Sequence, residues 1–466
     1  MLGKILPAVA LGGGVALLWP ELAWRAGTLQ LITANVDTLQ NVTVFKEQQI
    51  KHADILKNCE DVIILEEQGV ALLSCDPQRD AWNTVMGTFI DPSPPGAVFQ
   101  WFYTDPDSFP QPLAIENFGA RAVSDFHPLG IEYHAPSSTL YVVNHASSGP
   151  TVELFDYVPW NGFGRAVATH RVSVKHDALW TPNSVHALNG TSFLATNDHF
   201  FRIRDAFVAQ KVETYAALPG GSVVHVSIPE TLPAADAETG AVSLSPSEIR
   251  VRTVADRIPF ANGLALLNSS TLAVASTGAR SVKLYDFHVS DDDGAVALAY
   301  RTEVRAPAML DNVFVDAQGR LLAAGHPRPG ALAAMVARRA ECVRLRLRAE
   351  AAAVEQHGEE EGVDQRLGED ASEQEELADA QKPRTVKVAL SEEDRAALER
   401  CLETYDETSP SWVGELVVGE DGGLAWRELL VGHQGYGASS GVARDAKEGI
   451  VLVSGLYEKG IFIGKE

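Results

Sequence analysis

The chain has 466 residues, of which 45% are hydrophobic and 21% are charged, the composition of an ordinary globular protein. Its formal net charge is −24, from 38 basic and 62 acidic residues. Proteins bind nucleic-acid backbones through patches of lysine and arginine, so this charge argues against nucleic acid as a partner. The length allows a large buried core, and closed all-β folds of this size often form one domain.

The N-terminus has the pattern of a targeting segment. Lys4 precedes an apolar run from Ile5 to Trp19, which fits a signal-peptide core better than a membrane span of about twenty residues. We expect residues 1–24 to be a signal peptide or an uncleaved signal anchor, and an anchor would associate the protein with a membrane or lipid. Three Asn-X-Ser/Thr acceptors for N-glycosylation agree with the secretory pathway, at Asn41, Asn189 and Asn268. The sequence therefore predicts a secreted glycoprotein, extracellular or anchored by this segment.

The remaining residues, 25–466, are predicted to form a single domain that is interrupted by an acidic insertion at about 344–390. Within the insertion, residues 349–381 hold twelve Asp or Glu and one Arg. Such a segment buries too little apolar surface to offset the entropy of ordering, so we expect it to be disordered.

The four cysteines allow three disulfide pairings. Cys59 and Cys75 flank two apolar runs around a turn near residue 67, where a hairpin would place them opposite each other. A bond between Cys342 and Cys401 would close the acidic insertion into a loop. The alternative is free, partly buried thiols, which the secretory signals disfavour.

Six segments share one form, in which a short polar or Gly step leads into an apolar strand, a turn, and a second apolar strand. These segments are Cys59–Ser74, Leu129–Asn144, Asn183–Thr196, Asn262–Ser276, Asp311–Gly325 and Ser440–Ser454. Third strands follow at Thr151–Tyr157 and Ser281–Phe287. Repeated β-meanders of this kind indicate propeller blades, so the predicted fold is an all-β, six-bladed β-propeller.

The first strand of each propeller blade lines the central channel, so equivalent positions of different blades converge there. At the polar step this chain has Glu60 and Asp61, Asn183 and Ser184, Asn262, and Asp311 with Asn312. These side chains offer oxygen atoms without sulfur or imidazole, which suits calcium rather than zinc. Any one of them could instead be a turn former that bonds to its own backbone. The repeated position favours an ion site in the channel.

Several short segments resemble the serum paraoxonase/arylesterase family. They are residues 59–61, 142–145 with 151–155, 196–200, 260–263, 310–316 and 325–327, in that order. The resemblance covers about residues 55 to 460 without the insertion. It implies a six-bladed propeller with two calcium ions and hydrolysis of lactones, aryl esters and sometimes organophosphates.

The resemblance also assigns roles to residues. The ligands of a catalytic calcium would be Glu60, Asn183, Asn262, Asp311 and Asn312. A structural calcium would be held by Asp61, by the backbone carbonyl of Ile131, and by an Asp where this chain has Ser184, which weakens that site. The catalytic residues would be His145, Glu60 and Asp311, and the substrate pocket would include His199, His326 and Phe260.

One departure concerns the general base. The family usually has a His before Gly130, paired with the His that matches His145, and this chain has Leu129 there. We therefore expect a calcium-dependent hydrolase of small esters or lactones, with reduced activity. The alternative is a binding propeller that kept calcium for stability. A third interpretation is a related propeller of the lactonase or strictosidine-synthase-like type.

Overall fold

The structure is a computed structural model that describes residues 23–160, 162–235, 242–364, 391–419, 422–432 and 435–466. The N-terminal targeting segment and most of the acidic insertion lie outside these residues. The described residues fall into two compact units. The first extends to Ala333 and includes Thr408–Glu466, and the second is Ala334–Glu407.

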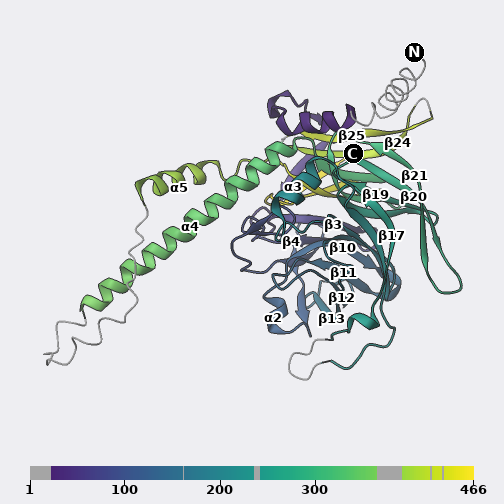
Figure 1. Cartoon of the computed structure of the whole chain (residues 1–466), viewed down its shortest axis with the longest axis horizontal. Helices are drawn as coiled ribbons and strands as arrows, with labels where there is room; N and C mark the ends of the chain where they lie inside the picture. The colour runs from purple at the N-terminus through teal and green to yellow at the C-terminus, as the bar shows by residue number, and fades with distance from the viewer. Residues whose placement is uncertain (1–22, 161, 236–241, 365–390, 420–421, 433–434) are drawn as a thin grey trace, which may run out of the picture. The chain divides into compact units, whose positions relative to one another are not determined.

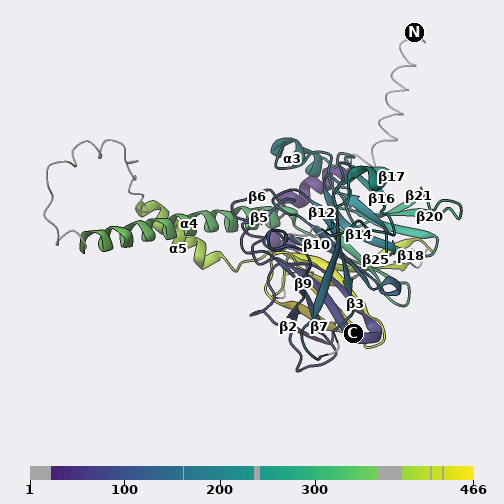
Figure 2. The same cartoon turned by 90° about the horizontal axis from the view of Figure 1, so that it is seen from below.

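The first unit contains six mainly antiparallel sheets, each with strands ordered outward from an innermost strand (Figures 1 and 2). Blades 1–3 are β3 (Cys59–Leu65), β4 (Val70–Cys75), β7 (Ala97–Phe102) and β8 (Gln111–Pro112); β10 (Pro128–His134), β11 (Thr139–Asn144), β12 (Thr151–Tyr157), β13 (Val167–Val174) and β9 (Ala114–Glu116); and β14 (Pro182–Asn189), β15 (Ser192–Asn197), β16 (Gly221–Ser227) and β17 (Arg250–Ile258). Blades 4–6 are β18 (Ala261–Asn268), β19 (Thr271–Ser276), β20 (Ser281–Val289) and β21 (Val296–Arg305); β22 (Met309–Val315), β23 (Leu321–His326), β24 (Ser411–Val418), β25 (Leu424–Gly432) and β1 (Val42–Thr43); and β26 (Ser439–Asp445), β27 (Ile450–Gly455), β28 (Ile461–Lys465) and β2 (Glu47–Lys51). A short hairpin, β5 (Trp82–Asn83) with β6 (Thr88–Phe89), lies outside the blades.

The innermost strands close into a ring. Each of β3, β10, β14, β18 and β22 contacts the innermost strand of the following blade, and β26 contacts β3. The six predicted hairpins are the inner pair of strands in each blade, so the six-bladed propeller is confirmed. Several hairpin turns use a glycine with positive φ, as at Gly69 (63°) and Gly319 (73°), where a side chain would be strained.

N-terminal residues complete the last two blades. β1 pairs with β25, and β2 pairs with β28 through partners such as Ile50 and Phe462. The last blade therefore contains β2 from the N-terminal part of the chain and β26–β28 from its C-terminal part, and this pairing closes the propeller ring. A helix over residues 23–33 also packs on the propeller, where Trp24 donates to the carbonyl of Ala279 (2.8 Å) and lies against the Arg280 guanidinium.

The two disulfide pairings favoured by the sequence are confirmed. Cys59 and Cys75 are cross-strand partners of β3 and β4 with 3.8 Å between their Cα atoms. Cys342 joins Cys401 within the second unit.

The second unit is helical. The helix α4 (Pro329–Asp364) begins in the first unit and includes the start of the acidic insertion, and α5 (Glu392–Thr404) follows the insertion. The Ser391 hydroxyl caps α5 by accepting the amide of Asp394 (3.0 Å). The disulfide between the two helices packs with Leu345 in a small apolar cluster. None of the described helices is long and apolar enough to cross a membrane.

Candidate channel site

Every innermost hairpin carries a register shift at the same step. The shifts skip Glu60 in blade 1, residues 129–130 in blade 2, 183–184 in blade 3, 262–263 in blade 4, 311–312 in blade 5 and Ser440 in blade 6. A β-bulge leaves its residue outside the ladder and changes the direction of its side chain. The polar steps recognised in the sequence are therefore the bulges of the six blades.

Glycines at this step let neighbouring blades approach closely. A Cβ on Gly130 would lie 2.6 Å from the carbonyl oxygen of Asn183, and one on Gly263 would lie 2.6 Å from the Cα of Asn312. These contacts are too short for any side chain, so blades 2 and 4 place backbone against the bulges of blades 3 and 5. This close approach holds Asn183 and Asn312 at fixed positions beside the channel.

The bulges open onto a cavity of about 70 Å³. Its lining includes one bulge residue from each of the first five blades, namely Glu60, Leu129, Asn183, Asn262 and Asp311. Ser440 of the sixth blade instead donates its hydroxyl to the Glu60 carbonyl (2.7 Å). Residues that lie far apart in the sequence thus meet in one site.

Four buried oxygen atoms of this cluster have no hydrogen-bond partner among the residues that the structure describes: Glu60 Oε2, Asn183 Oδ1, Asn262 Oδ1 and Asn312 Oδ1. Two of the three amide nitrogens are occupied, because Asn262 Nδ2 donates to Thr277 Oγ1 (3.1 Å) and Asn312 Nδ2 donates to Glu60 Oε1 (2.8 Å). A buried acceptor without a donor costs about 1–3 kcal/mol, and four such acceptors at one point fit a cation that all of them can coordinate. Carboxylate and amide oxygens are the ligands that calcium prefers, and the five predicted calcium ligands fit that ion.

The electrostatics agree with a cation in this position. Burial raises the pKa of the Glu60 carboxyl well above its ordinary value, and the charges of Asp61 and Asp311 act in the same direction. The charge of Arg79 and the hydrogen bond from Asn312 oppose this effect without cancelling it. Within the described residues, no group of three or more His, Cys, Asp or Glu side chains is arranged to hold a metal ion. The cluster therefore depends on its amide oxygens.

The wall of the cavity combines one imidazole with apolar side chains. His326 Nε2 lies 3.0 Å from Asp311 Oδ2, and the buried His326 Nδ1 has no hydrogen-bond partner in the described part of the chain. Phe260 and Leu129 also line the cavity, so the position before Gly130 presents hydrocarbon to the site. Of the three residues predicted for the substrate pocket, His326 and Phe260 are in this wall.

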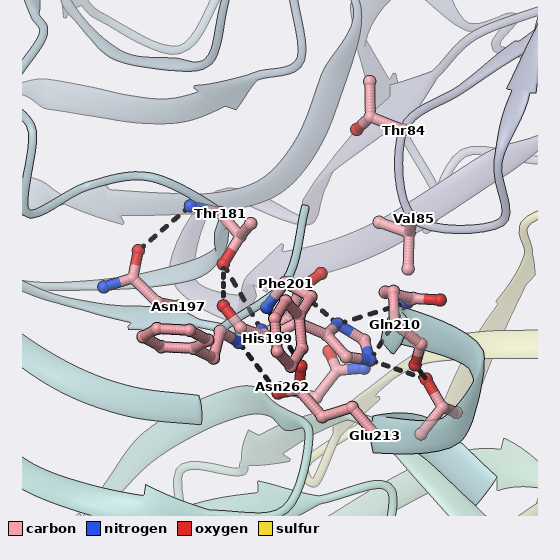
Figure 3. A network of polar contacts seen from close by, with 12 residues as sticks. Thr84, Val85, Thr181, Asn197, His199, Phe201, Gln210, Glu213 and Asn262 are labelled. Atoms are coloured by element: carbon pink, nitrogen blue, oxygen red, sulfur yellow. Dashed lines mark hydrogen bonds and ion pairs between the residues drawn. The ribbon is translucent and has the colours of Figure 1, made fainter. Parts of the chain in front are cut away.

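His145 and His199 line a separate cavity of about 250 Å³. His145 is held by Thr84 Oγ1 (2.5 Å from Nδ1) and by the Pro182 carbonyl (2.6 Å from Nε2), and burial lowers its pKa. The His199 ring faces Gln210 of α3 (Phe207–Tyr215), which lies 3.1 Å from His199 Nε2 (Figure 3). Val85 lines both cavities, and His199 contacts the wall of the channel cavity through Thr214 Oγ1 (2.7 Å from Nε2) and the Phe260 ring (4.3 Å between centroids).

The residues predicted for a second calcium lie together in a third cavity of about 210 Å³, lined by Asp61, Ile131 and Ser184. The Asp61 carboxylate accepts the backbone amides of Ile131 (3.0 Å) and Val62 (2.9 Å), and burial raises its pKa to about 7. Its oxygens are already hydrogen-bonded and Ser184 brings no charge. This group fits a divalent cation less well than the first cluster.

Comparison with known proteins identifies relatives of the chain. The model of the Arylesterase family matches residues 38–237. The chain is 28% identical to rat serum paraoxonase/arylesterase 1 over 242 residues, which cover 51% of this chain and 59% of that protein. It is 25% identical to mouse serum paraoxonase/lactonase 3 over 333 residues, which cover 70% of this chain and 81% of that protein.

The resemblance to the paraoxonase/arylesterase family is confirmed. Among solved structures, a gluconolactonase from Xanthomonas campestris covers 93% of this chain and 91% of its own length, with 13% identity and a TM-score of 0.41. That likeness is too weak to carry an argument. The match with the rat protein spans less than two thirds of that relative, so activity does not follow from it.

The paraoxonase resemblance did not point to every residue of the site. Arg79 lines the cavity and Thr277 orients Asn262, yet neither is at a polar step of a hairpin. Thr277 follows directly after β19, and Arg79 is in the loop after β4. Only their convergence in space distinguishes them from other loop residues.

Proposed function

We propose that this protein hydrolyses small carboxylic esters or lactones with a calcium ion bound in the channel. The observation that carries the proposal is the cluster of four unpartnered buried oxygens, contributed by blades 1, 3, 4 and 5. The relatives support the reaction class, because their names describe paraoxonases, arylesterases and lactonases. The ligands would be Glu60, Asn183, Asn262, Asp311 and Asn312.

When bound, calcium supplies a Lewis acid that polarises the carbonyl oxygen of the ester and stabilises negative charge there. The chain contributes a fixed geometry. Thr277 and Glu60 hold the Asn262 and Asn312 amides with their oxygens free, so these oxygens need no reorganisation during the reaction. Leu129 and Phe260 limit the water in the cavity.

The attacking water must lose a proton to the protein. His326 is suited to accept it, because donation from Nε2–H to Asp311 leaves Nδ1 as a free acceptor in the same cavity. Glu60 and Asp311 are the alternative acceptors. His145 would act only from the neighbouring cavity, and its catalytic role stays a prediction.

The first test measures hydrolysis of a panel of aryl esters and lactones, together with calcium content, on one preparation. Activity should disappear in excess chelator and return with calcium. Glu60→Gln and Asn262→Ala should abolish turnover, and His326→Gln should lower kcat roughly 10²–10⁴-fold. His288→Gln, an exposed histidine of β20, is the matched control and should retain activity. Full activity in excess chelator would contradict the proposal.

A binding protein is the second candidate, and Leu129 in the cavity wall favours it because hydrocarbon replaces the imidazole expected there. Calcium would then raise the unfolding temperature while no member of the panel is hydrolysed. The same preparation thus distinguishes the two functions.

We also propose that the protein passes through the secretory pathway. Its two disulfides are the support, since such bonds persist in oxidising compartments. For the second group of oxygens around Asp61, we propose at most weak calcium binding, because Ser184 lacks the charge of an aspartate.

A further inference from the structure

Arg79 is a buried arginine in the wall of the channel cavity. Its exposed fraction is 4%, and it lines the same cavity as Glu60 and Asp311. It forms no ion pair with a carboxylate of the described residues. An arginine side chain stays charged in proteins, and an unpaired buried charge is costly. Glu60 interacts with Arg79 electrostatically across the cavity without forming an ion pair, so the guanidinium can still take an anionic partner at close range.

Two backbone carbonyls hold the guanidinium in place. Arg79 Nε donates to the carbonyl of Asn58 (3.3 Å), and Nη2 donates to the carbonyl of Pro128 (3.0 Å). These acceptors precede β3 and begin β10, so the side chain is fixed between blades 1 and 2. Nη1 has no hydrogen-bond partner within the described part of the chain. Nη1 and the second N–H of Nη2 remain as a pair of donors.

The position of these donors relates them to the proposed reaction. Pro128 is the neighbour of Leu129, which occupies the cavity wall where a general base was expected. Arg79 cannot serve as that base, because it is not deprotonated in proteins. A fixed guanidinium with two donors is instead suited to bind a carboxylate through two parallel hydrogen bonds.

We propose that Arg79 determines substrate specificity by binding a carboxylate substituent of the ester or lactone, an inference that rests on hydrolysis in this cavity. A monoanion fits better than a phosphate dianion, because Glu60 and Asp311 already place negative charge in the same cavity.

The test compares two aryl esters of equal chain length, p-nitrophenyl butyrate and the mono-p-nitrophenyl ester of succinate. The wild type should prefer the succinate ester. In Arg79→Gln, kcat/KM for the succinate ester should fall about 10–100-fold, the effect of losing a charged hydrogen-bond pair, mainly through KM. The butyrate ester, assayed at saturating calcium because the charge of Arg79 also acts on Glu60, should lose less, so the ratio of the two kcat/KM values is the readout. Arg301→Gln, at an exposed ion pair of β21, is the control for loss of an arginine charge.

A purely structural role for Arg79 predicts equal losses with both esters, and that result would overturn the inference, as would a wild type without preference. Arg79→Lys keeps the charge without the two-pronged geometry and should recover only part of the preference. If Arg79→Gln does not fold, Arg79→Lys is compared with the wild type for its preference between the two esters.

A binding measurement separates this inference from the proposed function. Calorimetry of the calcium-loaded protein with monomethyl succinate should show binding that Arg79→Gln loses and that methyl butyrate does not show. Binding without turnover of any ester would contradict the proposed hydrolysis and leave the role of Arg79 intact. No binding by the wild type would overturn the role of Arg79.

Discussion

At the scale of the residue, the channel site shows how an amide can be fixed for a cation. An asparagine side chain offers a donor and an acceptor, and only one end can face the ion. Thr277 Oγ1 accepts a hydrogen bond from Asn262 Nδ2 and donates its own hydrogen to the Leu310 carbonyl (2.5 Å). Because the threonine hydrogen is directed to that carbonyl, its oxygen is free to receive the amide, and Asn262 Oδ1 is left for the channel.

This relay predicts the effect of Thr277→Val. The variant keeps the shape of the side chain and removes the acceptor, so Asn262 loses its orientation. Calcium affinity should fall about 10–100-fold, as for other partners that orient metal ligands. Calorimetric titration with calcium measures this effect. Thr302→Val on β21 is the control, and equal affinities of the two variants would contradict the relay.

At the scale of the element, a buried arginine joins the last two blades. Arg444 of β26 lies 3.0 Å from Asp316 Oδ2 through Nε, and 3.1 Å from Glu415 Oε1 of β24 through Nη2. Its Nη1 also lies 3.1 Å from Glu466 Oε1. Burial alone would raise the pKa of Glu415, but the bonds and charges of Arg444 and Arg427 bring it below its ordinary value.

Removing Arg444 should therefore be costly. Arg444→Met leaves Asp316 and Glu415 buried without their partner, and the free energy of unfolding should fall by about 3–5 kcal/mol. Arg427→Met, whose exposed side chain contacts the same Glu415, should cost at most about 1 kcal/mol. Denaturant unfolding at neutral pH measures both variants.

The ion pairs of Glu415 also make the stability of the protein depend on pH. The lowered pKa of Glu415 gives stability that is complete above the unfolded value of about 4.3 and is lost as the pH falls below it. For the comparison of Arg444→Met with Arg427→Met, equal free energies of unfolding at neutral pH would show that Arg444 is not the stabilising partner of Glu415.

The elements that the sequence predicts are those with local apolar patterns. All six inner hairpins could be found, because each pairs two apolar strands around a turn. β2 could not, because Glu47–Lys51 is largely exposed and its pairing with β28 depends on closure of the ring. α3 has no side-chain cap at Ala206 and gives no start signal. The bulge residues were predictable from their repeated position, whereas Arg79 has no such position.

At the scale of the whole molecule, the three glycosylation acceptors lie on the surface. Asn41, Asn189 and Asn268 are all exposed, and Asn189 and Asn268 are at the turns of the inner hairpins of blades 3 and 4. None lines the channel cavity. Glycans at these positions would leave the proposed site open.

Expression in a secreting eukaryotic host should therefore yield a protein whose mobility on gels increases after glycosidase treatment. Each of Asn41→Gln, Asn189→Gln and Asn268→Gln should remove one step of that shift and leave ester hydrolysis unchanged. Asn35→Gln, which is not in an acceptor motif, is the control. A glycosidase-resistant wild type would contradict the prediction.

The common bulge of the six blades determines which changes of side chain the site can accept. Its position is set by the backbone register of each hairpin and by glycines of the neighbouring blades, and not by the identity of the bulged side chain. A mutation at one bulge therefore exchanges one chemical group while five others keep their places. Leu129 illustrates such an exchange, since hydrocarbon occupies a bulge and the adjacent strands remain paired. The chemistry of the channel can therefore be varied one position at a time while the six inner hairpins keep their pairing.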